Sequence, residues 1–139
     1  ILTGENCIVT VPLYALSRLK YQLDNFQRFC EMIICNGTTK ELKLITGTLD
    51  KQDLLQSDER LENIRFHLQK YGIQMHWQRD SSLHSREIRT SDGWIILSDR
   101  GLDIYKKPEN RNEFGHFDLA LRRCKQTQIH VRRQLETLQ

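Results

Sequence analysis

The order of two hydrophobic periodicities in the first half of the chain limits the fold more than any other feature. Residues 7–14, 41–47 and 73–77 alternate apolar and polar side chains, which is typical of half-buried strands. Between them, apolar residues recur at helical spacing, first at Leu16, Leu19, Leu23, Phe26, Phe29, Cys30, Ile33 and Ile34, and then at Leu54, Leu61, Ile64, Leu68 and Tyr71. The order strand, helix, strand, helix, strand predicts a parallel sheet with right-handed crossovers.

Residues with strong local preferences mark the ends of these elements. Pro12 is expected to stop the first strand, because proline cannot donate to a strand ladder. Ser17 is a suitable cap for the first helix, and Asn36 with Gly37 is a typical helix end. Gly72 is expected to end the second helix in the same way.

The second half of the chain has shorter segments. Residues 87–97 contain two short strands around Ser91, Asp92 and Gly93, and Asp-Gly is the strongest hairpin signal in the sequence. Residues 94–97, beginning with Trp94, are apolar on both faces, which predicts a central strand covered on both sides.

Two further alternating stretches, 102–106 and 126–132, are predicted as strands, and residues 108–115 as a polar loop. The fold class that follows is α/β, with a mixed sheet flanked by helices. We expect a single domain over residues 1–133, followed by a tail or frayed helix at 134–139.

Composition excludes several classes of protein. The longest apolar run has four residues, far short of the roughly 20 that a membrane-spanning helix needs. No signal-peptide pattern follows Ile1, so the sequence reads as an excised domain of a longer cytoplasmic protein. The four cysteines show no paired spacing and are predicted to be reduced core residues. The five histidines form no ligand pattern, so neither a metal nor another cofactor is expected.

His84 follows the third predicted strand, where ligands bind in open α/β sheets. Its imidazole could attack phosphorus, with Arg86 and Arg89 holding phosphate oxygens through charge-assisted hydrogen bonds. In the alternative reading, His84 caps a loop and the arginines alternate out to solvent. The short pattern alone does not decide between the two.

Positive charge is concentrated toward the C-terminus, where residues 100–139 hold nine Lys/Arg against five Asp/Glu. A basic surface for anionic lipid or nucleic acid could form there from Lys106, Lys107, Arg111, Arg122, Arg123 and Lys125. The intervening Glu109 and Glu113 favour an ordinary surface instead.

Two residues beside this region have expected structural roles. Gly101 most simply permits a turn or bulge after the strand at 94–97. Asp103 is placed to pair with Arg86 or Arg100 across strands, which would orient an arginine.

Three stretches resemble a known family: "FQRFCEMII" at 26–34, "HSREIRTSDGWIILSDRGLDIYKKP" at 84–108 and "FDLALRRC" at 117–124. They are similar to the C-terminal domain of the MIT-domain-containing protein 1 family. The resemblance implies a phospholipase D-like fold. It also implies a homodimer that associates with phosphoinositide-containing membranes and takes part in ESCRT-III function during cytokinesis. ESCRT-III contact would come only through MIT helices outside these residues, and prokaryotic relatives of unclear function also exist.

Enzymes of the phospholipase D superfamily carry a His-x-Lys-x4-Asp motif twice. Here His84 matches the histidine, Arg86 replaces the lysine and Ser91 stands at the aspartate position. His130 starts a second match, but the aspartate position falls on Thr137. A mechanism with one imidazole as nucleophile and another as general acid would then need a second chain.

The resemblance therefore implies a catalytically silent domain that binds anionic phospholipid at the membrane periphery. The candidate anion-binding residues are His84, Arg86, Arg89, Arg100, Lys106, Lys107 and Arg122, and the candidate structural residues are Trp94, Gly93, Gly101 and Asp103. Two alternatives stay open: a phosphodiesterase or nuclease whose His84 site is completed by dimerisation, and a nucleic-acid or protein recognition domain of a bacterial multidomain protein.

Overall fold

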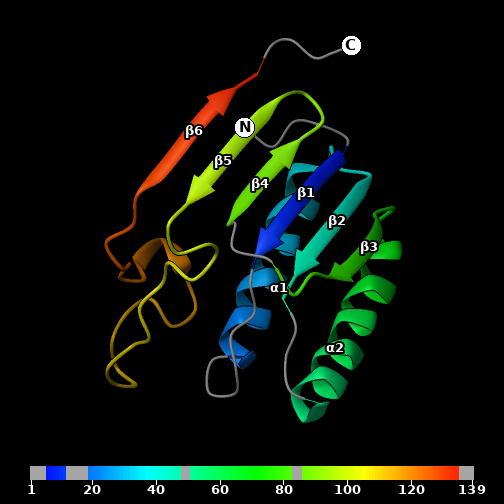
Figure 1. Cartoon of the computed structure of the whole chain (residues 1–139). Coiled ribbons are helices and arrows are strands. Elements are labelled where there is room, and N and C mark those ends of the chain that lie inside the picture. Colours follow the sequence, from blue (N-terminus) through cyan, green and yellow to red (C-terminus); the bar gives the residue numbers. More distant parts are fainter. Residues whose placement is uncertain (1–5, 12–18, 48–50, 83–85, 135–139) are drawn as a thin grey trace.

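The computed structural model describes residues 6–11, 19–47, 51–82 and 86–134. These residues form one six-stranded sheet with the strand order β3-β2-β1-β4-β5-β6 (Figure 1). The strands are β1 (Asn6–Val11), β2 (Glu41–Thr46), β3 (Gln74–Arg79), β4 (Glu87–Thr90), β5 (Trp94–Ser98) and β6 (Ile129–Arg133). The first three strands are parallel, and β4, β5 and β6 each run antiparallel to the strand before them in the sheet.

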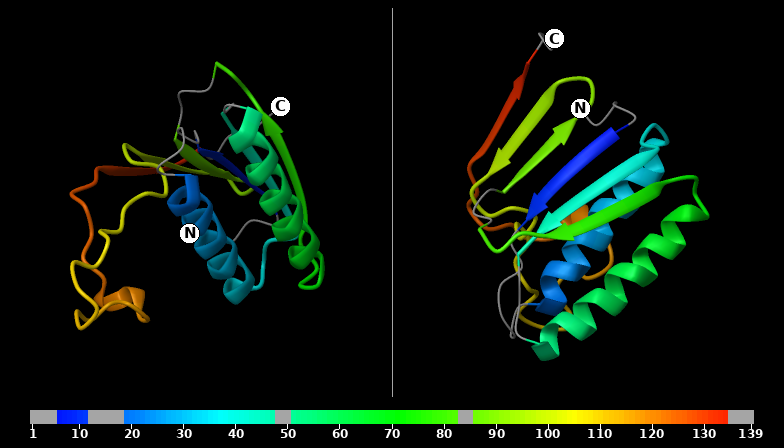
Figure 2. Two further views of the ribbon diagram at one scale, coloured as in Figure 1. Left: turned by 90° about the horizontal axis from the view of Figure 1, so that it is seen from below. Right: turned by 45° about the vertical axis from the view of Figure 1, so that its right-hand side comes forward.

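Both α-helices cover the same face of the sheet. Helix α1 (Leu19–Asn36) connects β1 to β2, and α2 (Lys51–Gln69) connects β2 to β3. Because both crossovers step in the same direction along the sheet, a common handedness places both helices on one side. Figure 2 shows this arrangement, with both helices beneath the half of the sheet that contains β1, β2 and β3.

The hydrophobic core lies between these helices and the sheet. Helix α1 contributes an apolar stripe at helical spacing, with Phe26 and Ile33 each 1% exposed. Leu42 and Leu44 of β2 meet it from the sheet, and Leu61 meets it from α2. The three predicted strands and two predicted helices are therefore confirmed within the described residues, and Gly37 and Gly72 end the helices with φ angles of 73° and 75°. The predicted strand stop at Pro12 and helix cap at Ser17 lie outside the described residues.

The Asp-Gly hairpin is also confirmed. Strands β4 and β5 pair antiparallel, and the backbone N–H of Gly93 donates to Thr90 O at 3.1 Å. Gly93 has a φ of 96°, and a Cβ there would lie 2.4 Å from the carbonyl oxygen of Gln134. Only glycine leaves room at this position for the backbone of Gln134, which follows β6. Trp94 opens β5, and the Arg133 guanidinium lies over its ring at 5.3 Å.

Two strand predictions are corrected. Strand β5 does have hydrogen-bonded neighbours on both sides, but only Ile95 is buried, because the helices lie under the other half of the sheet. Residues 102–106 are not a strand, and only Tyr105 forms an isolated bridge, to Cys124. Leu102, Ile104 and Tyr105 all line a cavity described below, so their apolar character reflects contact with that cavity and not a strand.

A long irregular connection joins β5 to β6, and we call residues 99–128 the connecting segment. It includes one short 3-10 helix, η2 (Leu119–Leu121), which is capped by the Asp118 side chain accepting from Ala120 N at 3.0 Å. Figure 2 shows the segment leaving the sheet on the same side as the helices. The tail predicted at 134–139 lies almost wholly outside the described residues.

The cysteines divide into two classes. All four are free thiols, as predicted, but only Cys7 and Cys30 are buried, whereas Cys35 and Cys124 are exposed. The prediction of four core cysteines is therefore wrong for two of them. Burial raises the pKa of both Cys7 and Cys30 from 9.0 to about 12.

We expect a thiol reagent such as Ellman's reagent to modify Cys35 and Cys124 rapidly in the native protein. Cys7 and Cys30 should react only on unfolding, because burial shields them and keeps them protonated. Above pH 9 the unfolded thiols ionise while the folded ones do not, so stability should fall as the pH rises toward 12. Two rapid equivalents, lost in the double variant C35S/C124S, would support this assignment, and four rapid equivalents would contradict it.

Candidate anion-binding site

Arg86 and Arg89, the two arginines that follow His84, do not lie in the same site. Arg86 directly precedes β4, whereas Arg89 within β4 is exposed and pairs with Glu87 at 3.0 Å. Arg89 stands directly opposite Ile95 in the sheet register. His84, the centre of the predicted motif, lies outside the described residues.

Arg86 lines a small open pocket of about 290 Å³ at the end of the β4–β5–β6 half of the sheet. Its guanidinium Nη1 donates to the carbonyl oxygen of Asp99 at 2.9 Å, and the Asp99 carboxylate accepts from the backbone N–H of Gln128 at 3.1 Å. His130 of β6 lines the same pocket. We call this group, Arg86 with Ser98, Asp99, Gln128 and His130, the Arg86 pocket.

The Arg86 pocket has the composition of a small anion site. A guanidinium and an imidazole can both donate hydrogen bonds to phosphate oxygens, while the neighbouring Asp99 carboxylate weakens the net attraction. His130 is its only histidine among the residues that the structure describes. His130 begins the incomplete second motif in the sequence. Because β6 pairs antiparallel with β5, His130 lies in the same pocket as Arg86.

The remaining predicted basic residues lie on the connecting segment or at its start. Arg100 donates through Nε to the carbonyl oxygen of Gln126 at 2.8 Å, and Gly101 adopts a φ of 60° in the turn beside it. Asp103 pairs with Lys125 at 2.9 Å, which replaces the expected pair with Arg86 or Arg100. Arg100 and Lys125 therefore tie the two ends of the segment together.

Arg122 and Arg123 bond to the middle of the same segment, at residues 109–116. Arg122 donates through Nε to Gly115 O at 2.6 Å and through Nη2 to His116 O at 3.2 Å. Arg123 pairs with Glu113 at 2.6 Å and with Glu109 at 3.3 Å. A hydrogen bond from the Glu109 backbone and then the Arg123 guanidinium lower the pKa of Glu113 below its ordinary value.

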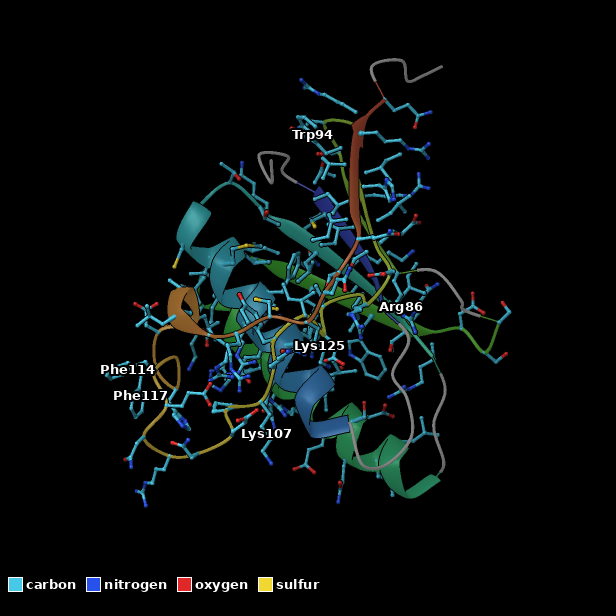
Figure 3. The ribbon with its side chains drawn as sticks, turned by 90° about the vertical axis from the view of Figure 1, so that its left-hand side faces the viewer. Arg86, Trp94, Lys107, Phe114, Phe117 and Lys125 are labelled. Carbon is cyan, nitrogen blue, oxygen red and sulfur yellow. The ribbon has the colours of Figure 1, made fainter. Side chains whose placement is uncertain are left out.

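Three cations of the segment project into solvent. Lys106, Lys107 and Arg111 are exposed, and their side chains have no hydrogen-bond or ion-pair partner among the described residues. Figure 3 shows Lys107 on the lower part of the segment, well apart from Arg86. The structure thus divides the predicted anion-binding residues into the Arg86 pocket and the connecting segment, with Arg89 in neither.

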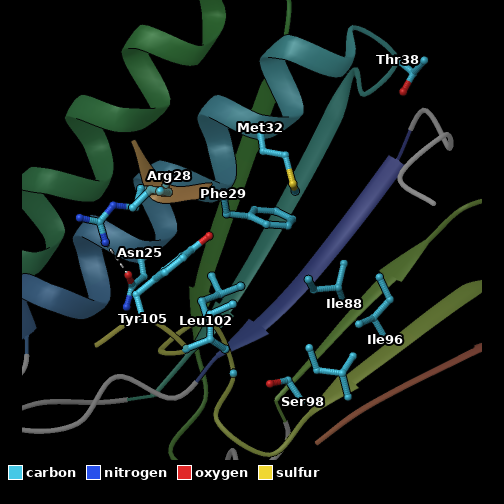
Figure 4. Close-up of a pocket in the computed structure, with 14 residues that line it drawn as sticks. Asn25, Arg28, Phe29, Met32, Thr38, Ile88, Ile96, Ser98, Leu102 and Tyr105 are labelled. Carbon is cyan, nitrogen blue, oxygen red and sulfur yellow. Dashed lines mark hydrogen bonds between the residues drawn. The ribbon is translucent and has the colours of Figure 1, made fainter. Parts of the chain in front are cut away.

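A larger apolar cavity of about 700 Å³ lies between α1, the sheet and the connecting segment (Figure 4). Phe29 and Met32 of α1 face Ile88 and Ile96 of the sheet across it, and Leu102 lines it near Tyr105. At one side Arg28 donates to the Asn25 side chain at 3.0 Å, with its guanidinium 6.0 Å from the Tyr105 ring. This lining suits contact with apolar groups and offers no acid–base pair.

No group of three or more His, Cys, Asp or Glu residues in the described part of the chain is placed to hold a metal ion. Cys7 of β1 and Cys30 of α1 are buried in the core between the sheet and the helices.

Comparison with known proteins identifies the family. Residues 14–133 match the model of the phospholipase D-like domain at the C-terminus of MIT. The chain belongs to this family. MIT domain-containing protein 1 of the mouse is 39% identical over 117 residues, which is 82% of this chain and 46% of that relative. The chain therefore spans about half the length of the relative.

The structure adds two facts about this phospholipase D-like domain. Strand β1 lies between β2 and β4, so the folded sheet includes residues that precede the matched range. Neither α1 nor α2 combines the length and apolarity required to cross a bilayer, as judged over the described residues.

Gly115 is the residue on which the shape of the connecting segment depends. Its φ is 99°, and a Cβ there would lie 2.8 Å from both Arg122 Cα and Leu121 O. Gly115→Ala should therefore destabilise the protein by about 2–3 kcal/mol, because backbone atoms cannot move aside as a flexible side chain would. Thermal unfolding is the measurement.

Gly37→Ala is the matched control for this prediction. Gly37 also has a positive φ, 73°, but an added Cβ would meet nothing within 4 Å. It should lose only about 1 kcal/mol, from backbone strain alone. Equal losses in the two variants would show that the close approach at Gly115 does not matter.

Proposed function

We propose that this phospholipase D-like domain is a non-catalytic module that docks a longer protein on anionic phospholipid membranes. The observation that carries the proposal is the unpartnered state of the Lys106, Lys107 and Arg111 side chains on a segment whose acidic side chains are already engaged. Cations in this arrangement attract anionic headgroups by about 1 kcal/mol each near the surface.

The charge balance of the segment supports this choice of partner. Residues 106–125 hold six Lys/Arg against three Asp/Glu, so their net charge of +3 equals that of the whole chain. Glu109 and Glu113 pair with Arg123, and the Asp118 carboxylate caps η2, so none of the three projects toward a ligand unengaged. The acidic residues thus shape the segment, and its outward field is positive.

The Arg86 pocket is the proposed site for a headgroup phosphate. Arg86 and His130 can both donate hydrogen bonds to phosphate oxygens, which supports binding of an anion in this pocket.

The setting of the domain follows from its family. The family description places such domains at the C-terminus of MIT, and the mouse relative is named for an MIT domain. Within this proposal, an MIT domain elsewhere in the longer protein contacts ESCRT-III during cytokinesis. The domain described here brings that protein to the membrane.

Neutralising the exposed lysines should weaken membrane binding. We expect K106Q/K107Q to lose about 2 kcal/mol, roughly 30-fold in affinity, for vesicles of phosphatidylcholine with phosphatidylserine and a phosphoinositide. Co-sedimentation at increasing salt is the measurement, and wild-type binding should fall steeply as salt rises.

R65Q/K70Q removes the same charge from α2 and from the turn directly after it, and is the matched control. It should bind vesicles nearly as well as the wild type, because α2 lies on the opposite side of the molecule from the connecting segment (Figure 1). Equal losses in both double variants would reduce the effect to net charge. Binding that ignores salt would remove the proposal.

The Arg86 pocket gives a separate prediction with a soluble ligand. Titration calorimetry with inositol trisphosphate should show binding that weakens roughly tenfold in R86Q, since a charge-assisted hydrogen bond is worth about 1.5–3 kcal/mol. R86K keeps the charge and should lose less. R65Q, on α2, should bind as the wild type does, and an unchanged affinity in R86Q would exclude this pocket.

A further inference from the structure

Two phenylalanines project from the connecting segment into solvent. Phe117 is 101% exposed and Phe114 is 84% exposed, more than any other large hydrophobic residue that the structure describes. Burial of a phenylalanine side chain stabilises a protein, so two such exposed rings on one short loop indicate an interaction surface. We call residues 114–117 the aromatic tip.

Hydrogen bonds from side chains to backbone oxygens hold the tip in place. Arg122 donates to the carbonyl oxygens of Gly115 and His116, the two residues between the phenylalanines. His116 Nε2 lies 2.8 Å from the carbonyl oxygen of Asn110, which fixes the other side of the loop. The rings are therefore displayed on an ordered loop, and a partner that buries them does not first have to order it.

Positive charge flanks the tip. Arg111 lies three residues before Phe114 in sequence, and Lys107 stands on the same part of the segment (Figure 3). Two carboxylates adjoin the tip in sequence: Glu113 is engaged by Arg123, and Asp118 accepts from Ala120 N. Aromatic rings with cations beside them match the boundary of an anionic bilayer, where hydrocarbon lies just below phosphate.

We propose that Phe114 and Phe117 insert into the interfacial region of the membrane while Lys107 and Arg111 contact its headgroups. The inference rests on the proposed membrane function and adds the mode of contact. A projecting pair of rings favours a bilayer over a folded partner, because a bilayer deforms around a convex tip whereas a protein would need a matching pocket.

The test compares F114A, F117A and F114A/F117A in vesicle co-sedimentation. Each single variant should bind roughly tenfold more weakly and the double variant more weakly still, because each removes an apolar ring from the bilayer. F66A is the control, since Phe66 of α2 is also an exposed phenylalanine, at 56%. It should bind as the wild type does.

A second variant reports insertion directly. F117W should show a blue-shifted fluorescence increase with anionic vesicles, over the background of Trp77 and Trp94 in the wild type, and brominated lipids should quench it. F117W does not remove an apolar ring, so it should retain vesicle affinity.

The outcomes separate the two proposals. A wild type that does not bind anionic vesicles overturns the membrane function and the tip with it. Salt-sensitive wild-type binding that F114A/F117A leaves unchanged, with no vesicle response from F117W, overturns only the tip. An equal loss in F66A would also overturn it, because any exposed ring would then matter.

Discussion

The sheet is wider than its helices can cover. A helix is about 10 Å across and strands are spaced about 4.8 Å apart, so two helices cover roughly four of six strands. Both lie on one face, under β1, β2 and β3 and close to β4. The helices therefore leave the β5–β6 end largely uncovered, and all five residues of β6 are exposed. The connecting segment leaves this end on the helix side, and the cavity lies between it, α1 and the sheet.

This arrangement explains why so many basic residues have structural partners. A segment with little regular structure must satisfy its backbone groups by other means. Arg100 and Arg122 do so by donating to carbonyl oxygens, while Arg123 and Lys125 engage the acidic side chains. Only the cations that the segment does not need for its own shape, Lys106, Lys107 and Arg111 among them, are left to define its outer charge.

Sequence patterns predicted the features that depend on residues close together in the chain. The alternation of strand and helix, the glycine that ends α1 and the Asp92-Gly93 hairpin are fixed by neighbours in sequence, and all were predictable. The meeting of His130 with Arg86 depends on the pairing of β6 with β5, which sequence spacing does not encode. The pattern at 102–106 predicted a strand wrongly, because Leu102, Ile104 and Tyr105 line a cavity and residues 102–105 are all half-buried.

The bonds from Arg122 end on backbone oxygens, which every residue type possesses. Side chains between Asn110 and Arg122 that make no structural bond can therefore change without dismantling the scaffold, provided that Gly115 stays and that Glu113, His116 and Asp118 keep their contacts. Evolution is free to retune what this part of the surface recognises, one substitution at a time, at little risk to the fold. The same property makes the loop a convenient place to graft foreign recognition sequences.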